Sequence, residues 1–252
     1  TARSFTTPAE QQIYGFEIDE SNTNSKTAVV YIGDAIGMTP ASGNNGNFNW
    51  GSWEPFVKEI SRPVVVKNGV EQYDLNYDDY NLKASGGASN LTGSDGDVFT
   101  RFEHIHMKHT KISNGHRWEL SDKPFPGSFS MTEEMENGYN QFNNPKLVTL
   151  QNLFILIFKD RDSQTALGRG RVDGAGYIAS GNTNDKGYMF GSTSDVQMKF
   201  LGIEDFWGNK YQWIDGLVSD SNHNLLLGDK SFNDSGSGYS KQDTNISSNT
   251  AG

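Results

Sequence analysis

Short alternating segments of apolar and polar residues predict a protein built mainly from short strands. Residues 14–19 alternate as a strand does, and the apolar run at 28–32 predicts a second strand. The clearest hairpin spans 64–73, because Asn68 and Gly69 are the residue types that a type I′ turn requires. Further strands are expected at 98–107, at 117–120, which would pair with it, and at 196–201.

Two other segments carry the spacing of a helix. In the range 53–60 the apolar residues fall at i, i+3, i+4 and i+7, and Ser52 precedes them as a candidate N-cap. A second helix is expected to begin at Pro145, with Asn144 as its cap. The apolar run 153–158 is also compatible with a buried strand, but the length of the whole pattern favours a helix.

The composition indicates one domain with many loops and an aromatic core. Of the 252 residues only 34% are hydrophobic, whereas 28 are glycine and 12% are aromatic. Such a balance is typical of a turn-rich domain in which rings replace part of the aliphatic core. We therefore expect a polar N-terminal arm at 1–12 and a single α+β domain at 13–252.

Charge and cysteine content exclude several classes of function. The formal net charge is −10 and the sequence has no cluster of Lys and Arg, which argues against nucleic-acid binding. No apolar run approaches the roughly 18 residues of a membrane-spanning helix. Because the chain has no cysteine, disulfides, thiolate metal sites and cysteine catalysis are excluded.

The most informative stretch is a Trp-Gly-Asn turn followed by a second tryptophan. It comprises Trp207, Gly208, Asn209, Trp213 and Asp215. Glycine and asparagine tolerate the positive φ of a tight turn, and a strand is expected to follow. The two indole rings are large enough to anchor a loop-rich domain, so we expect both to be buried. The string resembles the signature of one branch of C-type-lectin-like domains, which includes formylglycine-generating enzymes, phage tropism determinants and the variable proteins of diversity-generating retroelements.

The resemblance extends over much of the chain and implies a C-type-lectin-like fold with short strands, two helices and long Gly/Asn/Ser loops. The segments that look like phage lectin-like or tail-associated proteins are 14–19, 34–40, 96–99, Trp118, 123–127, the helix from Pro145, and 162–168. One departure concerns the usual binding positions, which in this family lie in a later Gly-Gly-Trp segment. Here no tryptophan follows Trp213. We therefore expect the C-terminal part to be incomplete or to complete the fold differently.

What the resemblance implies about function is a surface-exposed phage virion protein, above all a tail-associated adhesin that recognises a glycan or protein on the host cell. Other virion proteins and identical copies, arranged as a homotrimer, are the further partners it implies. The alternative is a structural virion component, such as a capsid decoration or tail-scaffold protein, without receptor binding. An oxidative enzyme of the formylglycine-generating type is disfavoured, because that chemistry needs active-site cysteines. We expect no enzymatic activity and no cofactor.

Tyr77, Asp78, Asp79 and Tyr80 form a candidate sugar-binding motif. Tyrosine rings can stack on the faces of pyranose sugars, and carboxylates accept hydrogen bonds from sugar hydroxyl groups. The alternative is an ordinary exposed loop, which is the commoner outcome for such a polar cluster.

Two further clusters have residue types found in metal sites. His104, His106 and His109, with His116 nearby, have the composition of a three-histidine site if the first two share one face of a strand. The alternative is polar strand residues that face solvent or a subunit interface, and we expect no metal bound within one subunit. The segment 220–224 alternates oxygen-bearing side chains, but it lacks the Gly and distal Glu of an EF-hand, so a solvated turn is favoured.

Overall fold

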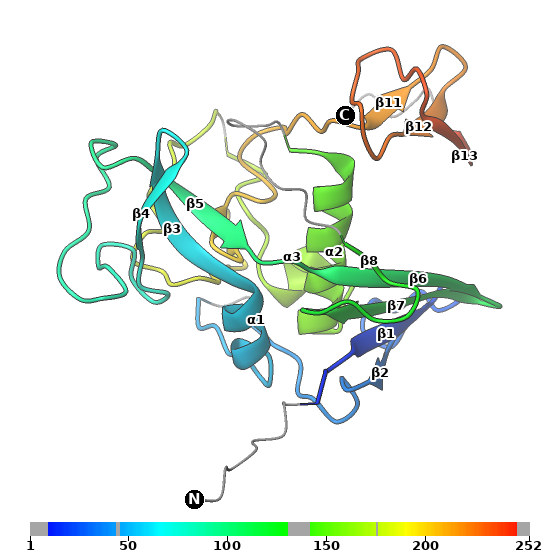
Figure 1. Ribbon diagram of the computed structural model, residues 1–252, viewed down its shortest axis with the longest axis horizontal. Helices are drawn as coiled ribbons and strands as arrows, with labels where there is room; N and C mark the ends of the chain where they lie inside the picture. The colour runs from blue at the N-terminus through cyan, green and yellow to red at the C-terminus, as the bar shows by residue number, and fades with distance from the viewer. Residues whose placement is uncertain (1–9, 44–45, 131–141, 175, 246–252) are drawn as a thin grey trace, which may run out of the picture.

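The computed structural model describes residues 10–43, 46–130, 142–174 and 176–245. Short antiparallel strands dominate, and two helices of seven or more residues accompany them (Figure 1). The α+β class predicted from the sequence is confirmed.

The largest sheet has five antiparallel strands. Their order is β2-β1-β7-β6-β8, and their bounds are β1 (Tyr14–Asp19), β2 (Val29–Gly33), β6 (His106–Ile112), β7 (Gly115–Ser121) and β8 (Phe129–Ser130). The predicted strands at 14–19, 28–32 and 117–120 all belong to this sheet. Its strands therefore come from two separate parts of the chain, residues 14–33 and residues 106–130.

A second sheet has the order β4-β3-β5, with β3 (Ser61–Lys67), β4 (Val70–Asp74) and β5 (Asp97–Phe102). In the β3–β4 turn Asn68 has φ 52° and Gly69 has φ 77°, which confirms the predicted type I′ hairpin. The strand expected at 98–107 is wrong as a single element, because β5 and β6 lie in different sheets. Between them Ile105 is completely buried, so the chain crosses through the core from one sheet to the other.

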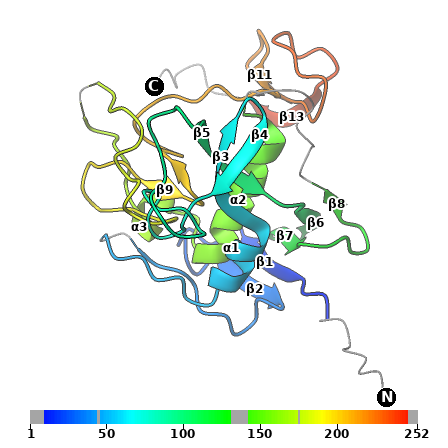
Figure 2. The same ribbon diagram turned by 60° about the vertical axis from the view of Figure 1, so that its left-hand side comes forward.

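Both predicted helices are present, with small differences at their starts. The first helix, α1 (Glu54–Ile60), leads directly into β3 (Figure 2). Its N-cap is Trp53 and not Ser52, whose hydroxyl oxygen accepts a hydrogen bond from the Thr39 amide at 2.9 Å.

The second helix begins one residue earlier than expected. It is α2 (Asn144–Phe158), and the side chain of Asn143 caps it by accepting from the Lys146 amide at 3.0 Å. The strand alternative for 153–158 is thereby excluded. A third helix, α3 (Ser163–Ala166), has a single turn.

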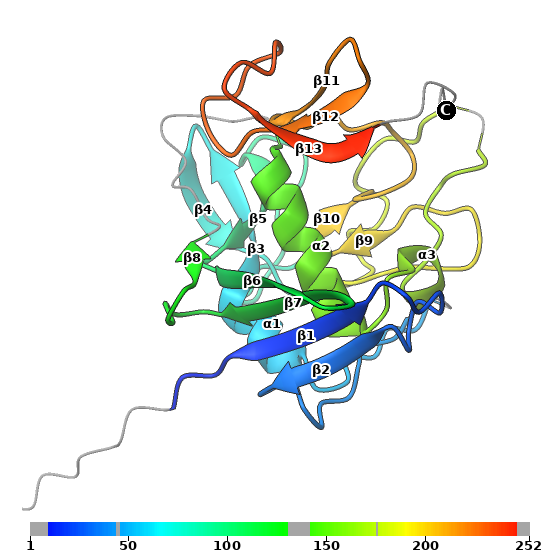
Figure 3. The ribbon, with the colours of Figure 1, turned by 90° about the vertical axis from the view of Figure 1, so that its right-hand side faces the viewer.

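Rings form much of the core, as the composition predicts. The helix α2 contacts β1 and lies across the inner face of the five-stranded sheet (Figure 3). Around Trp53, which is completely buried, Tyr14, Tyr31 and Phe56 pack with ring centroids 5.3–6.0 Å away. Phe154 and Phe158 of α2 pack with Phe200, Phe206 and Trp207 in a second group of rings. No helix of the described residues has both the length and the apolarity to cross a membrane.

The last third of the chain is organised by turns. A short hairpin joins β9 (Lys199–Phe200) and β10 (Ile203–Glu204), so the strand expected at 196–201 is confirmed only in its last part. A separate sheet of order β11-β12-β13 follows, with β11 (Leu217–Ser219), β12 (Asn224–Leu227) and β13 (Ser240–Asn245). It lies beyond the N-terminal end of α2 (Figure 3). Within the described residues the hydrophobic core contains no side chain beyond Trp207.

Ending the chain after Gly216 is therefore expected to leave the rest of the fold intact. Removal of β11, β12 and β13 takes away no residue of the core, so the free energy of unfolding of the remainder should change by less than about 1 kcal/mol. Thermal unfolding of the full chain and of residues 1–216, followed by near-ultraviolet circular dichroism, measures the change. Loss of a cooperative transition in the shorter chain would contradict this description of the core.

Candidate functional site

The Trp-Gly-Asn turn holds two distant segments together. Gly208 has φ 76° and Asn209 has φ 58°, so the predicted tight turn with positive φ is confirmed. The side chain of Asn209 accepts a hydrogen bond from the Ile178 amide and donates one to the Ile178 carbonyl, both at 2.9 Å. It also donates to Asp205 Oδ2 at 2.6 Å. Asn209 thus acts as a substitute strand partner for Ile178 and fixes the position of its neighbours.

Trp207 connects this turn to the core. Its indole Nε1 donates a hydrogen bond to the Gly168 carbonyl at 2.9 Å, and its ring packs edge-on against Phe154 at 5.7 Å. The side chain is partly buried. The anchoring role expected for Trp207 agrees with these contacts.

The expectation for Trp213 is wrong, because its side chain is 85% exposed. In the described part of the chain residues 210–214 belong to no strand, and the pairing nearby is an isolated bridge between Asp215 and Asn143. The side chain of Gln212, itself exposed, donates to the Asp205 and Phe206 carbonyls at 3.2 and 3.3 Å and ties this segment back to the residues before the turn. Its two neighbours, Tyr211 and Trp213, project into solvent.

Tyr177 is brought close to the same segment. The Lys210 Nζ atom lies 4.2 Å from the centre of the Tyr177 ring, and Tyr177 is 72% exposed while Tyr211 is 92% exposed. We name Tyr177, Lys210, Tyr211 and Trp213 the exposed aromatic segment. Large rings with so much accessible surface, held on a fixed turn, are suited to contact a ligand.

The loop that follows Tyr177 is fastened to β9 and β10. Glu204 accepts hydrogen bonds from the Gly181 amide at 2.5 Å and from the Thr183 amide and hydroxyl at 3.1 and 2.9 Å. Lys199, which is 1% exposed, donates to the Thr183 carbonyl at 2.5 Å and lies 4.0 Å from the centre of the Tyr80 ring. Burial lowers the pKa of Lys199 to about 8, although the charge of Glu204 opposes this shift.

This lowered pKa makes stability depend on pH. The folded chain releases the Lys199 proton near pH 8, whereas the unfolded chain keeps it up to about 10.5, so the free energy of unfolding should rise between these values. In Lys199→Met the rise should be smaller by about 1 kcal/mol per pH unit between roughly pH 8.5 and 9.5. Urea unfolding at several pH values measures the slope, and Lys186→Met is the exposed control. Equal slopes in wild type and Lys199→Met would contradict the buried-lysine assignment.

The residues predicted as a sugar site serve mostly other contacts. Tyr80 is 2% exposed, and the Tyr77 hydroxyl donates a hydrogen bond to the Ser61 carbonyl while its ring packs on Tyr188 at 4.9 Å. Asp79 accepts from the Asn81 amide at 2.9 Å. Although Asp78 is exposed, the Tyr80 ring cannot stack on a sugar, because the protein itself covers it. The candidate ligand surface therefore lies at the exposed aromatic segment.

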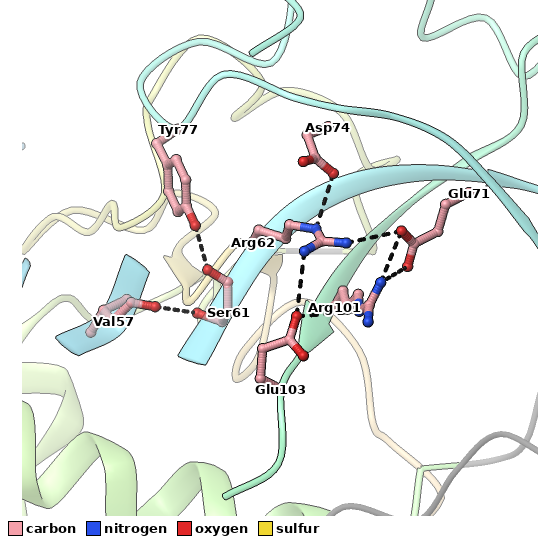
Figure 4. A network of polar contacts seen from close by, with 8 residues as sticks. All are labelled: Val57, Ser61, Arg62, Glu71, Asp74, Tyr77, Arg101 and Glu103. Carbon is pink, nitrogen blue, oxygen red and sulfur yellow. Dashed lines mark hydrogen bonds and ion pairs between the residues drawn. The ribbon is translucent and has the colours of Figure 1, made fainter. Parts of the chain in front are cut away.

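A group of charged side chains on the β4-β3-β5 sheet is paired internally (Figure 4). Arg62 and Arg101 lie directly opposite each other on β3 and β5, which would be unfavourable without compensation. Glu71 lies 3.0 Å from Arg62 and 2.9 Å from Arg101, while Asp74 and Glu103 lie 3.1 and 3.3 Å from Arg62. Because each carboxylate offsets an arginine and all five are partly exposed, we assign this network a modest structural role.

The histidines do not form the three-ligand cluster that their spacing suggested. Strand β6 begins at His106, after His104, and His109 contacts His116 of β7 instead. Within the part of the chain that the structure describes, no group of three or more His, Asp or Glu side chains is placed to hold a metal ion.

The segment 220–224 is the turn of the β11–β12 hairpin. Asp220 Oδ1 accepts from the Asn222 and Asn224 amides at 2.9 Å. The Asp220 carboxylate therefore stabilises the turn by accepting these backbone hydrogen bonds, which agrees with the solvated turn favoured from the sequence.

Comparison of the chain with protein-family models, with curated proteins and with solved structures found no match. The assignment of a site therefore rests on the geometry of the chain alone. Sequence reasoning missed Tyr177, Lys210 and Tyr211. The available signal was the alternation of polar Lys210 and Gln212 with two rings directly after a tight turn.

Proposed function

We propose that this chain is a surface-exposed phage virion protein, a tail-associated adhesin of C-type-lectin-like fold that binds a host-surface glycan through the exposed aromatic segment. One observation carries the proposal: Tyr211 and Trp213 are 92% and 85% exposed on a segment whose backbone is held by Gln212. A single exposed apolar residue is ordinary, but grouped exposed apolar surface is typical of interaction sites, and here two large rings are exposed within three residues. The sequence resemblance to phage lectin-like proteins supports the same function.

A glycan is the ligand whose chemistry fits these side chains best. Pyranose sugars offer C–H faces on which aromatic rings stack, and hydroxyl groups that bond with polar neighbours. Lys210 supplies a donor beside the rings, and it is held above Tyr177 at 4.2 Å. A site made of exposed rings is shallow and binds weakly by itself, since lectin-type recognition depends on several such contacts.

Several copies would make such a weak site effective. When identical sites are linked in one particle, the later binding events become intramolecular and gain from the effective concentration. We therefore propose a homotrimer that docks on the other virion proteins through the polar arm 1–12, of which residues 1–9 lie outside the described residues.

The test is binding of the purified full chain to a glycan array and to intact host bacteria. The proposal expects retention of a defined set of cell-wall glycans and saturable binding to cells. A chain that binds neither, yet is incorporated into particles, would support the structural alternative instead. That alternative is favoured by one observation, the β11-β12-β13 sheet, which lies outside the hydrophobic core and is available for contacts with other virion proteins.

A further inference from the structure

Two histidines share a hydrogen bond at the far end of the β6–β7 hairpin. His109 Nε2 lies 2.6 Å from His116 Nδ1. The ring centroids are 4.8 Å apart and the ring planes differ by 24°. The distance between the ring centroids exceeds the distance between the two nitrogens by about twice the distance from the centre of an imidazole ring to its nitrogen. The two nitrogens therefore face each other along the line between the rings, as in an N–H···N hydrogen bond.

The pair lies on the inner face of the five-stranded sheet, where this face extends past the core. In the register of the strands His109 stands opposite Trp118, and Trp118 stands opposite the completely buried Phe16. The His109 ring also stacks on the Trp118 indole, with centroids 4.4 Å apart and planes 25° apart. His109 thus covers one face of a partly buried tryptophan.

Charged neighbours come from two strands. Lys111 of β6 places its Nζ 3.1 Å from His116 Nε2, and Glu20, which follows β1, places Oε1 at 3.1 Å from the same nitrogen. Lys111 and Glu20 also pair with each other at 3.2 Å. Arg117 and Glu17 form another ion pair nearby. Because successive residues of a strand point to opposite faces, this pair lies on the outer face of the sheet, away from the histidines.

The hydrogen bond between His109 and His116 depends on how many protons the two facing nitrogens carry. The nitrogens that face each other can hold one proton between them, whether the pair is neutral or carries a single positive charge. When both rings are charged, both of these nitrogens carry a proton, and a separation of 2.6 Å no longer permits a hydrogen bond. Burial, together with the charges of His116 and Lys111, lowers the pKa of His109.

We propose that His109 and His116 form a proton-sensitive contact that covers Trp118 at neutral pH and separates when both rings become charged. Acidification below the ordinary histidine pKa of about 6.5 then exposes the indole face and loosens the end of the β6–β7 hairpin. This inference is independent of the aromatic segment and of any ligand.

Two measurements on the full chain test the proposal. In the histidine NMR titration, His109 should take up its proton at a lower pH in the wild type than in His116→Gln, because the charge of His116 opposes that of His109. In acrylamide quenching, the part of the fluorescence that Trp118→Phe removes should become more accessible between about pH 7.5 and pH 5.

Two variants and one control separate this contact from a general effect of acid. His116→Gln and His109→Gln should each abolish the change at Trp118. His223→Asn removes an exposed imidazole in the β11–β12 turn and should preserve the change. Titration of His109 at the same pH in the wild type and in His116→Gln, or a change at Trp118 that persists in both Gln variants, would overturn the proposal. So would the same change caused at about pH 7.5 by added Zn²⁺ and reversed by EDTA, since the pair would then be a metal site.

Discussion

Replacing Trp53 with alanine is expected to lower the free energy of unfolding by roughly 3–5 kcal/mol. Trp53 is completely buried, and Tyr14, Tyr31 and Phe56 contact it with centroids 5.3, 5.7 and 6.0 Å away. These rings come from β1, β2 and α1, so the cavity left by alanine would lie where a helix meets the largest sheet. Such a junction is held from several sides and cannot readily collapse. Equilibrium urea unfolding measures the loss.

The same substitution at Trp213 is the matched control. Its side chain is 85% exposed, so Trp213→Ala should change the free energy of unfolding by no more than about 0.5 kcal/mol. Similar losses at the two positions would mean that Trp213 is buried in solution, and the basis for the proposed site would disappear.

Trp213, whose replacement should hardly change stability, is expected to matter strongly for ligand binding. Trp213→Ala is expected to weaken binding to host cells or to a retained glycan by roughly 30-fold, which corresponds to about 2 kcal/mol and is typical of a tryptophan at the centre of an interface. The physical reason is the loss of a large ring that can cover a sugar face without first giving up contacts within the protein. Tyr211→Ala should act in the same direction. Surface plasmon resonance with immobilised glycan measures both.

Phe129→Ala serves as the control for exposed aromatic residues in general. Phe129 is 47% exposed and lies on β8, in a different part of the chain. Its removal should leave binding unchanged. If Phe129→Ala weakened binding as much as Trp213→Ala, the interaction would be a nonspecific attraction to exposed rings.

The parts of the fold that the sequence predicts are those with local causes. The β3–β4 hairpin follows from Asn68 and Gly69, because few other residue pairs adopt positive φ in succession. The helix α2 follows from its apolar spacing and from an asparagine cap, although the cap is Asn143 and not Asn144. Such signals act within a few residues, so the remainder of the fold has little influence on them.

The parts that could not be predicted depend on which segments meet in space. The run 98–107 alternates as one strand, and only the burial of Ile105 between two sheets divides it. Likewise Tyr211, Trp213 and Ile214 resemble the start of a strand, but none of them pairs with a strand of the described residues. The hydrogen bonds of Gln212 to the Asp205 and Phe206 carbonyls depend on how the segment folds back on the turn, which the local sequence does not specify. The Tyr80 ring of the predicted sugar site is unavailable for a related reason: it is covered by Lys199, a residue distant in the sequence.

If the Trp213 ring contacts the ligand, as we propose, its own fluorescence should report the contact. Of the five tryptophans, Trp213 alone is exposed; Trp53 is buried, and Trp50, Trp118 and Trp207 are partly buried. The acrylamide-accessible emission should therefore come mainly from Trp213 and be absent in Trp213→Phe. We expect this emission to become protected from acrylamide when host cell-wall glycan is added to the wild type. Saturable glycan binding with unchanged accessibility of Trp213 would contradict it.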